Sequence, residues 1–139
     1  MTVELVALSD RPLDVAAHFA AVAHPAAGAV ASFVGVVRDH DPGARGEVTL
    51  LEYSAHPSAA DELARIARGL DAPGLRIAVS HRIGDLAVGE TAIVACVASA
   101  HRAEAFDACR ELVERVKAEL PVWKRQHAAD GTTNWVGIA

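Results

Sequence analysis

Apolar and polar residues follow two rhythms along the chain, and these predict strands and helices in turn. Short segments dominated by apolar residues predict strands, and segments in which apolar residues recur every three or four positions predict helices. The predicted strands cover residues 3–8, 28–37, 48–55, 75–84 and 91–100, with two short strands between residues 122 and 138. The predicted helices cover residues 10–23, 57–71 and 101–120. Because this order contains few parallel crossovers, it favours an α+β fold with a mainly antiparallel sheet and flanking helices, in a single domain of residues 1–139.

The middle of the chain contains two strands joined by a loop rich in Asp, Pro and Gly. Residues 28–37 carry almost no polar side chain, which predicts a buried strand at the centre of the sheet. Residues 39–47 have the composition of a flexible loop. Residues 48–55 are therefore expected to return antiparallel to the first of these strands. A second turn-rich segment, residues 85–90, separates the next two strands.

The predicted helices begin and end at residues suited to helix termini. Asp10 and Pro12 resemble the cap and the first turn of the first helix. The last helix ends before Pro121, and Lys117 directly follows Val116 on it. Lys117 is therefore expected at the border of a buried stripe. The apolar residues of that stripe are Phe106, Cys109, Leu112 or Val113, Val116 and Leu120.

Composition and charge narrow the possible classes of function. Of the 139 residues, 52% are hydrophobic and 22% are charged, which is typical of a soluble globular domain. The formal net charge of -5 argues against a general surface for nucleic acid or acidic membranes, so any anion site has to be local. No apolar run reaches the roughly 18 residues of a membrane span, and no signal peptide is visible. We therefore expect a cytoplasmic protein.

Positive charges gather where predicted strands and helices end, although the chain as a whole is acidic. Strand ends and helix starts are positions at which binding sites are commonly built. Each cation alone is typical of a solvated surface, whereas together they indicate a compact anionic substrate such as a phosphate. These residues are Arg38, His101 and Arg102 at strand ends, and Lys117, Lys124 and Arg125 around Pro121.

Other chemistries have weaker support in the sequence. The seven histidines show no HxH, HExxH or Cys/His spacing of a zinc site, so no metal is expected. Neither GxGxxG nor GxxxxGK is present, and Ser99 is not part of a GxSxG elbow. Cys96 and Cys109 lie on apolar segments and are expected to be core residues.

Several segments together carry a recognisable pattern. They are GAVASFVGVVRDHDPG, LEYSAHPSAADELARIA, HRIGDLAVGE, SAHRAEAFDACRELVERVKAELPVWKRQ and the closing NWV. In this order they resemble the catalytic (large) subunit of molybdopterin synthase, the MoaE family, from about residue 28 to residue 136. The SAHR…AF block, followed by a lysine seven residues before the WK lysine, is specific to that family.

The resemblance implies an α/β-hammerhead fold and a sulfur-transfer activity. Members of this family convert cyclic pyranopterin monophosphate into molybdopterin by installing the two dithiolene sulfurs. Sulfur arrives as a thiocarboxylate on the C-terminal Gly-Gly of a small ubiquitin-like sulfur-carrier subunit, so neither a cofactor nor a catalytic cysteine is implied. Two large subunits pair at the centre of a heterotetramer, with one small subunit at each outer end.

The resemblance also implies roles for particular residues. Lys117 and Lys124 match the catalytic lysines of the family. The role of Lys117 can be that of a base, a nucleophile or a charge stabiliser, and the sequence does not choose between them. His101 and Arg102 match the pair that reaches the pterin phosphate from a second protomer. The implied substrate-binding residues are Val36, Val37, Arg38, His101, Arg102, Lys117, Lys124, Arg125 and Gln126, with Phe33 near the pocket.

The sequence departs from the family pattern at two places, and two other functions stay open. Val36 stands where some relatives carry lysine, and the chain ends three residues after Val136 where some relatives extend a basic tail. Both departures bear on substrate affinity. A non-catalytic module that binds a ubiquitin-like tail or a phosphorylated metabolite stays open, as does a cysteine hydrolase using Cys96 or Cys109. Dependence of turnover on Lys117 separates catalysis from mere binding.

Overall fold

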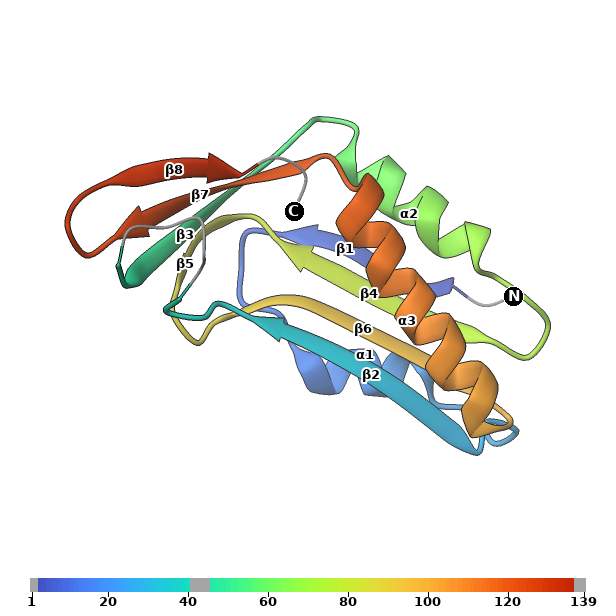
Figure 1. Cartoon of the computed structure of the whole chain (residues 1–139). Coiled ribbons are helices and arrows are strands. Elements are labelled where there is room, and N and C mark those ends of the chain that lie inside the picture. Colours follow the sequence, from blue (N-terminus) through green and yellow to red (C-terminus); the bar gives the residue numbers. More distant parts are fainter. Residues whose placement is uncertain (1–2, 41–45, 137–139) are drawn as a thin grey trace.

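The computed structural model describes residues 3–40 and 46–136, which form two four-stranded sheets and three helices (Figure 1). The first sheet has the strand order β1-β4-β6-β2. Its strands are β1 (Val3–Ser9), β4 (Arg76–Arg82), β6 (Thr91–Ser99) and β2 (Ala29–Val36). The second sheet, of order β5-β3-β7-β8, projects from one end of the first. Its strands are β5 (Gly84–Ala87), β3 (Val48–Ala55), β7 (Val122–Ala128) and β8 (Thr133–Val136).

Strand pairing is antiparallel throughout the described residues, except that β1 runs parallel to β4. This confirms the predicted α+β fold, although the strands divide into two sheets. The chain passes from β4 in the first sheet to β5 in the second around Gly84, whose φ of 90° favours glycine. β5 occupies part of the segment expected to be a turn, because a strand of four residues is too short for alternation to be visible.

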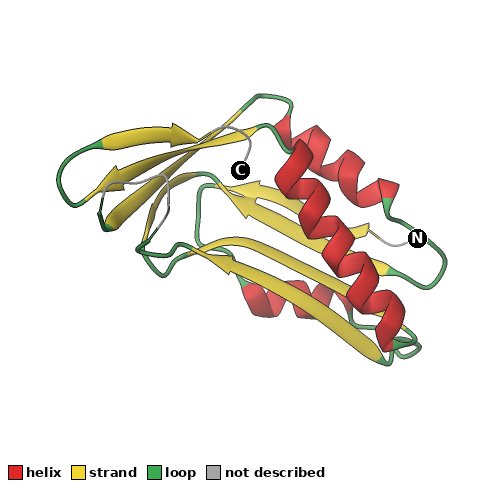
Figure 2. Cartoon of the chain, in the orientation of Figure 1, coloured by secondary structure: helices red, strands yellow, loops and turns green. Residues whose placement is uncertain are grey.

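The helices lie on both faces of the first sheet (Figure 2). α1 (Val15–Val22) covers one face, and α2 (Ala59–Gly69) and α3 (Arg102–Glu119) cover the other. Alternate residues of β4 point into the two layers: Ile77 joins the core under α2 and α3, and Ala78 joins the cluster under α1. Burial of both faces explains why β6 is apolar at every position between Thr91 and Ser99.

The first helix begins later than predicted. Its N-cap is Asp14, whose Oδ1 accepts a hydrogen bond from the backbone N–H of Ala17 at 3.1 Å. Asp10, the expected cap, lies outside the helix. The chain turns there because Ser9 Oγ accepts a hydrogen bond from the N–H of Arg11. A capping residue type is therefore present at both positions, and only Asp14 is followed by helical backbone.

The long helix α3 buries a stripe close to the predicted one. Its buried residues are Ala105, Cys109, Leu112, Val113 and Val116. Phe106 was expected in this stripe but is 65% exposed, because it lies one position past the buried Ala105 and so at the border of the stripe. Lys117 follows Val116 at the edge of the stripe, as predicted.

The prediction that residues 28–37 form a central buried strand is wrong. β2 lies at the edge of the first sheet and pairs, among the described residues, with β6 alone. Its side chains Val30, Val34 and Val36 are 42%, 39% and 56% exposed. β3 does not return beside β2, because it lies in the second sheet between β5 and β7. Residues 41–45 of the loop expected between them lie outside the described residues.

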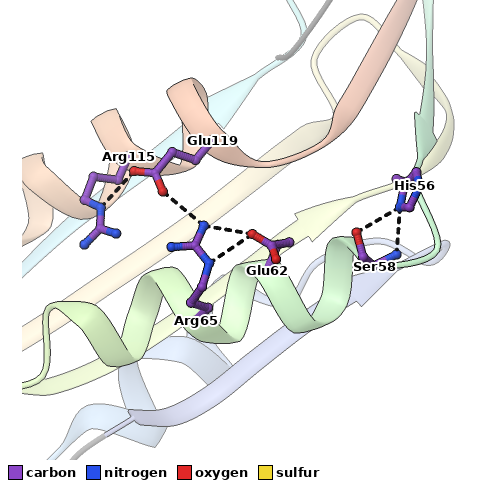
Figure 3. Close-up of polar contacts among 6 residues, drawn as sticks. All are labelled: His56, Ser58, Glu62, Arg65, Arg115 and Glu119. Carbon is purple, nitrogen blue, oxygen red and sulfur yellow. Dashed lines mark hydrogen bonds and ion pairs between the residues drawn. The ribbon is translucent and has the colours of Figure 1, made fainter.

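Four charged side chains connect α2 to α3 on the surface (Figure 3). Arg65 Nη2 lies 2.8 Å from Glu62 Oε2 and 3.1 Å from Glu119 Oε1. Arg115 donates from Nε to the other oxygen of Glu119 at 3.0 Å. The hydrogen bonds from Arg115 and then Arg65 lower the pKa of Glu119 below its usual range. Any stabilisation from this shift is present above the pKa of an unfolded glutamate and is lost as pH falls.

Removal of this carboxylate should have a small and salt-dependent effect. Glu119→Gln is expected to lower the midpoint of thermal unfolding by less than about 5 °C at pH 7, because exposed ion pairs contribute little. The difference from wild type should shrink in high salt and in acid, where Glu119 is protonated. Thermal melts of Glu119→Gln and of Glu111→Gln, an exposed change on the same helix, measure this. An equal loss in both variants would contradict a role for the ion pairs.

Candidate active site

A cavity of about 310 Å³ lies where the two sheets meet the C-terminal end of α3. Its wall combines the ends of β2, β4 and α3 with the inward-facing side chains of β3, β6 and β7. The backbone N–H of His56 donates to the carbonyl of Pro121 at 3.0 Å, which ties the end of β3 to the end of α3. The lining residues are Gly35, Val36, Arg38, Val48, Leu51, Tyr53, His81, Ala92, Ile93, Lys117, Lys124 and Gln126.

Alternation along β7 decides which of its side chains reach the cavity. Lys124 and Gln126 share one face of the strand and line the cavity. Arg125 lies between them and therefore faces the other way. Its Nη1 is 3.8 Å from Glu52 Oε1, and its Cζ lies 5.3 Å from the ring centroid of Trp135. The structure therefore does not bring Arg125 to the cavity within this chain.

The lining of the cavity carries three basic side chains. The whole chain contains only two lysines, Lys117 and Lys124, and both line this cavity together with Arg38. No carboxylate stands among the described lining residues. Partial burial and then the charge of Lys124 lower the pKa of Lys117 below its usual 10.5; Arg38 adds to this, whereas Glu114 opposes it. The cavity can therefore hold an anion beside an amine that loses its proton more readily than an ordinary lysine.

Two lining residues with titratable side chains were missed by the sequence analysis. His81 and Tyr53 are both buried, and their rings meet edge to face with centroids 5.1 Å apart. Nδ1 of His81 lies 2.7 Å from the carbonyl oxygen of Arg82. Burial lowers the pKa of His81 to about 4 and Lys117 adds to this, whereas the hydrogen bond to Arg82 opposes it. The imidazole is thus neutral at pH 7. A histidine in the apolar run IAVSH was the available signal.

The end of β2 contributes unequally to the cavity. Val36 lines it, whereas Val37 is only 3% exposed and belongs to the core. The backbone of Val37 is fixed from both sides, because its N–H donates to the carbonyl of Glu90 and its carbonyl accepts from Gly89. This anchor positions Arg38 at the cavity, although the Val37 side chain does not reach it.

Three other predicted site residues lie away from this cavity. His101 and Arg102 line a separate hollow with Gly28 and Ala29 at the opposite end of α3 (Figure 1). Sixteen helical residues at 1.5 Å each separate His101 from Lys117 by about 24 Å. Phe33 lines another hollow, between β2 and α3. Within one chain, the structure does not bring these three residues to the lysines.

Both cysteines are buried and poorly suited to nucleophilic chemistry. Cys96 and Cys109 are 0% and 5% exposed. Burial, with a contribution from Cys109, raises the pKa of Cys96 to about 11, and burial raises the pKa of Cys109. Neither thiol lines the cationic cavity. The geometry thus disfavours the cysteine-hydrolase alternative, because a reactive cysteine needs an exposed thiolate.

Cysteine replacements should therefore change stability and spare activity. Cys96→Ser is expected to destabilise the protein by about 1–3 kcal/mol, because a hydroxyl replaces a thiol in an apolar site. Cys109→Ser should cost less, since its Sγ lies 4.0 Å from the carbonyl of Ala95, an acceptor for the hydroxyl. Urea unfolding and single-turnover assays measure both effects. A well-folded variant that had lost activity would show that a thiol takes part in the reaction.

In the described ranges, no group of three or more His, Cys, Asp and Glu side chains is arranged to hold a metal ion. No helix among the same residues is both long and apolar enough to cross a bilayer.

The known proteins that this chain resembles all belong to one family. The profile of the MoaE protein family matches residues 8–119. The chain is 44% identical over 133 residues to molybdopterin synthase catalytic subunit 1 of Mycobacterium tuberculosis, covering 94% of this chain and 88% of that one. It is 38% identical over 140 residues to the molybdopterin synthase catalytic subunit of Halalkalibacterium halodurans, covering 99% and 88%.

Solved structures of molybdopterin synthase proteins have the same fold as this chain. The crystal structure of molybdopterin synthase from Staphylococcus aureus matches with a TM-score of 0.86 at 31% identity, covering 94% of this chain and 95% of that one. A complex of subunits 1 and 2 of molybdopterin-converting factor from Helicobacter pylori has the same fold, with a TM-score of 0.75 at 18% identity over 95% and 88% of the two chains. Since the family profile and these relatives span most of the sequence, the chain belongs to the MoaE family.

Proposed function

We propose that this protein is the catalytic subunit of a molybdopterin synthase. It transfers sulfur from the thiocarboxylated C-terminus of a small ubiquitin-like carrier subunit to cyclic pyranopterin monophosphate, forming the dithiolene of molybdopterin in the cytoplasm. The observation that carries this proposal is the cavity at the sheet junction, which joins both lysines of a MoaE-family chain to Arg38.

The charges in the cavity suit a thiocarboxylate. Its negative charge is attracted by Lys117, Lys124 and Arg38, and charge that develops on its carbonyl oxygen during transfer is stabilised by the same groups. A lowered pKa lets Lys117 also accept a proton or attack the acyl carbon. The sulfur comes from the partner, so the burial of both cysteines is compatible with this reaction.

The phosphate-binding pair is assigned to a second copy of the chain. Ala29, at the start of β2, pairs with Ser99, just before His101 and Arg102, whereas Val36 at the other end lines the cavity. β2 is an edge strand of eight residues, about 24 Å from end to end at 3.4 Å per residue. That length equals the separation of His101 from Lys117 along α3. Antiparallel pairing of β2 with the β2 of a second copy would therefore bring the partner's His101 beside this chain's cavity.

Adding one carrier subunit to each copy of this pair gives a heterotetramer. The Helicobacter pylori protein of the same fold was solved as a complex of two subunits of molybdopterin-converting factor, which supports a small partner subunit here. We assign two copies of this chain to the centre and one carrier subunit to each outer end. In this assembly Phe33 and Phe106, which line one hollow between β2 and α3, lie near the central interface.

Reconstitution tests the proposal against its alternative. The full chain is mixed with thiocarboxylated carrier and cyclic pyranopterin monophosphate, and molybdopterin is quantified by fluorescence after oxidation. Formation of molybdopterin that requires both components supports the proposal. If the chain bound the carrier or the pterin but formed no molybdopterin, it would be a non-catalytic binding module instead.

A further inference from the structure

One wall of the cavity carries a buried hydrogen-bond acceptor without a donor. The side chain of Gln126 is 2% exposed, and its Oε1 has no hydrogen-bond partner among the described residues. Gln126 lines the cavity on the same face of β7 as Lys124. A buried acceptor without a partner disfavours the empty state, so a ligand that brings a donor to this oxygen gains affinity.

His81 supplies a second acceptor in the cavity lining. Its Nδ1 carries the proton and donates it to the carbonyl oxygen of Arg82, since a carbonyl cannot donate in return. In the neutral ring, Nε2 is then an unprotonated acceptor, and it has no partner in the part of the chain that the structure describes. The perpendicular ring of Tyr53 fixes the imidazole plane, so Tyr53 is a positioning residue.

The two kinds of group in the cavity select different parts of a ligand. In their charged forms, Lys117, Lys124 and Arg38 carry only donors and suit an anionic end. Gln126 Oε1 and His81 Nε2 are neutral acceptors and suit N–H groups. A peptide C-terminus in extended form has both features, with N–H donors directly behind its terminal anion. A Gly-Gly tail has no side chains, so its backbone groups are the only means of recognition.

We propose that Gln126 and His81 accept hydrogen bonds from the peptide N–H groups of the carrier's C-terminal tail and determine specificity for it. This assignment rests on the proposed function, because it takes the carrier tail as the ligand of the cavity. The cations hold the end of the tail, and the two acceptors hold the peptide groups behind it. The acyl carbon is thereby placed beside Lys117.

Carriers in which a single N–H is removed test the contact directly. The carrier is made by semisynthesis with a terminal carboxylate, as native peptide or with an ester in place of the last or the preceding peptide bond. Binding to the full chain is measured by isothermal titration calorimetry. Wild type should bind at least one ester carrier about 5- to 20-fold more weakly than the native carrier, the worth of one hydrogen bond.

Variants of the two acceptors should abolish that difference. Gln126→Leu or His81→Phe should bind the native carrier about 5- to 20-fold more weakly and no longer discriminate against the matching ester. Gln126→Glu retains acceptor oxygens and should still discriminate, as should Leu51→Met, a similar-sized change in the same lining. Circular dichroism verifies the fold of each variant.

The remaining outcomes overturn the assignment in distinguishable ways. If wild type binds native and ester carriers equally, or if both acceptor variants keep the full ester penalty, the acceptors do not hold the tail. If the variants instead bind cyclic pyranopterin monophosphate more weakly and the carrier normally, the acceptors serve the pterin N–H groups. In these cases the proposed function stands. If wild type does not bind the native carrier at all, the proposed function fails as well.

Discussion

Replacement of Lys117 by alanine is expected to lower the rate of sulfur transfer at least about 100-fold while the fold and the carrier complex persist. Lys117 lines the cavity from the last turn of α3, outside the buried stripe, so its loss leaves the core unchanged. The pKa of its amine is lowered below the usual 10.5, which favours proton transfer or attack. Single-turnover formation of molybdopterin measures the rate, and calorimetry with the carrier measures the complex.

Lys117→Arg should not restore the rate, because a guanidinium keeps its proton and presents it in a different geometry. A single-turnover rate near that of wild type in Lys117→Ala would refute the catalytic assignment. The chain has only two lysines, so NMR of reductively ¹³C-methylated protein can follow each amine through a pH titration. Lys117 should titrate below 10.5, and a base or nucleophile role requires the rate to rise with pH through that same titration.

Two inactive variants should recover activity when mixed, if the site is shared between copies. Arg102→Ala lacks part of the phosphate-binding pair, and Lys117→Ala lacks the catalytic amine. In a mixed dimer, one of the two cavities combines an intact Lys117 with the partner's intact Arg102. With random exchange about half of the dimers are mixed, so roughly a quarter of wild-type activity should return.

The matched control is a mixture of His101→Ala with Arg102→Ala. Both changes affect the same surface, so every cavity of a mixed dimer lacks one of the two residues and activity should not be restored. Affinity tags of different kinds on the two variants quantify subunit exchange. Exchange without recovery in the first mixture would place the whole site within one chain.

Strand alternation explains what the sequence can and cannot say about the site. Period two along β7 is sufficient to separate Lys124 and Gln126 from Arg125. The prediction that all three residues bind substrate rested on their adjacency in the family motif and did not take this alternation into account. His81 and Tyr53 could not be assigned in this way. They lie on different strands, and which strands meet at the cavity depends on how the two sheets join.

The error over β2 has a different physical origin. Hydrophobicity along residues 28–37 indicates that something covers this segment, but it does not say whether the cover belongs to the same chain. The sequence therefore predicts burial and leaves its source undetermined. The helix α3 was predictable because its pattern extends over several turns, whereas the four residues of β5 were too few.

The exposed edge of β2 also bears on how the protein is made. Residues 29–36 contain no charge and no proline, and such a segment can pair with almost any other strand. A newly synthesised single chain would therefore be prone to aggregation until a second copy covers this edge. Changes that weaken the proposed pairing should reduce the yield of soluble protein in the cell even where each chain folds normally. The strand that would complete the catalytic site is then also the point at which expression and solubility are decided.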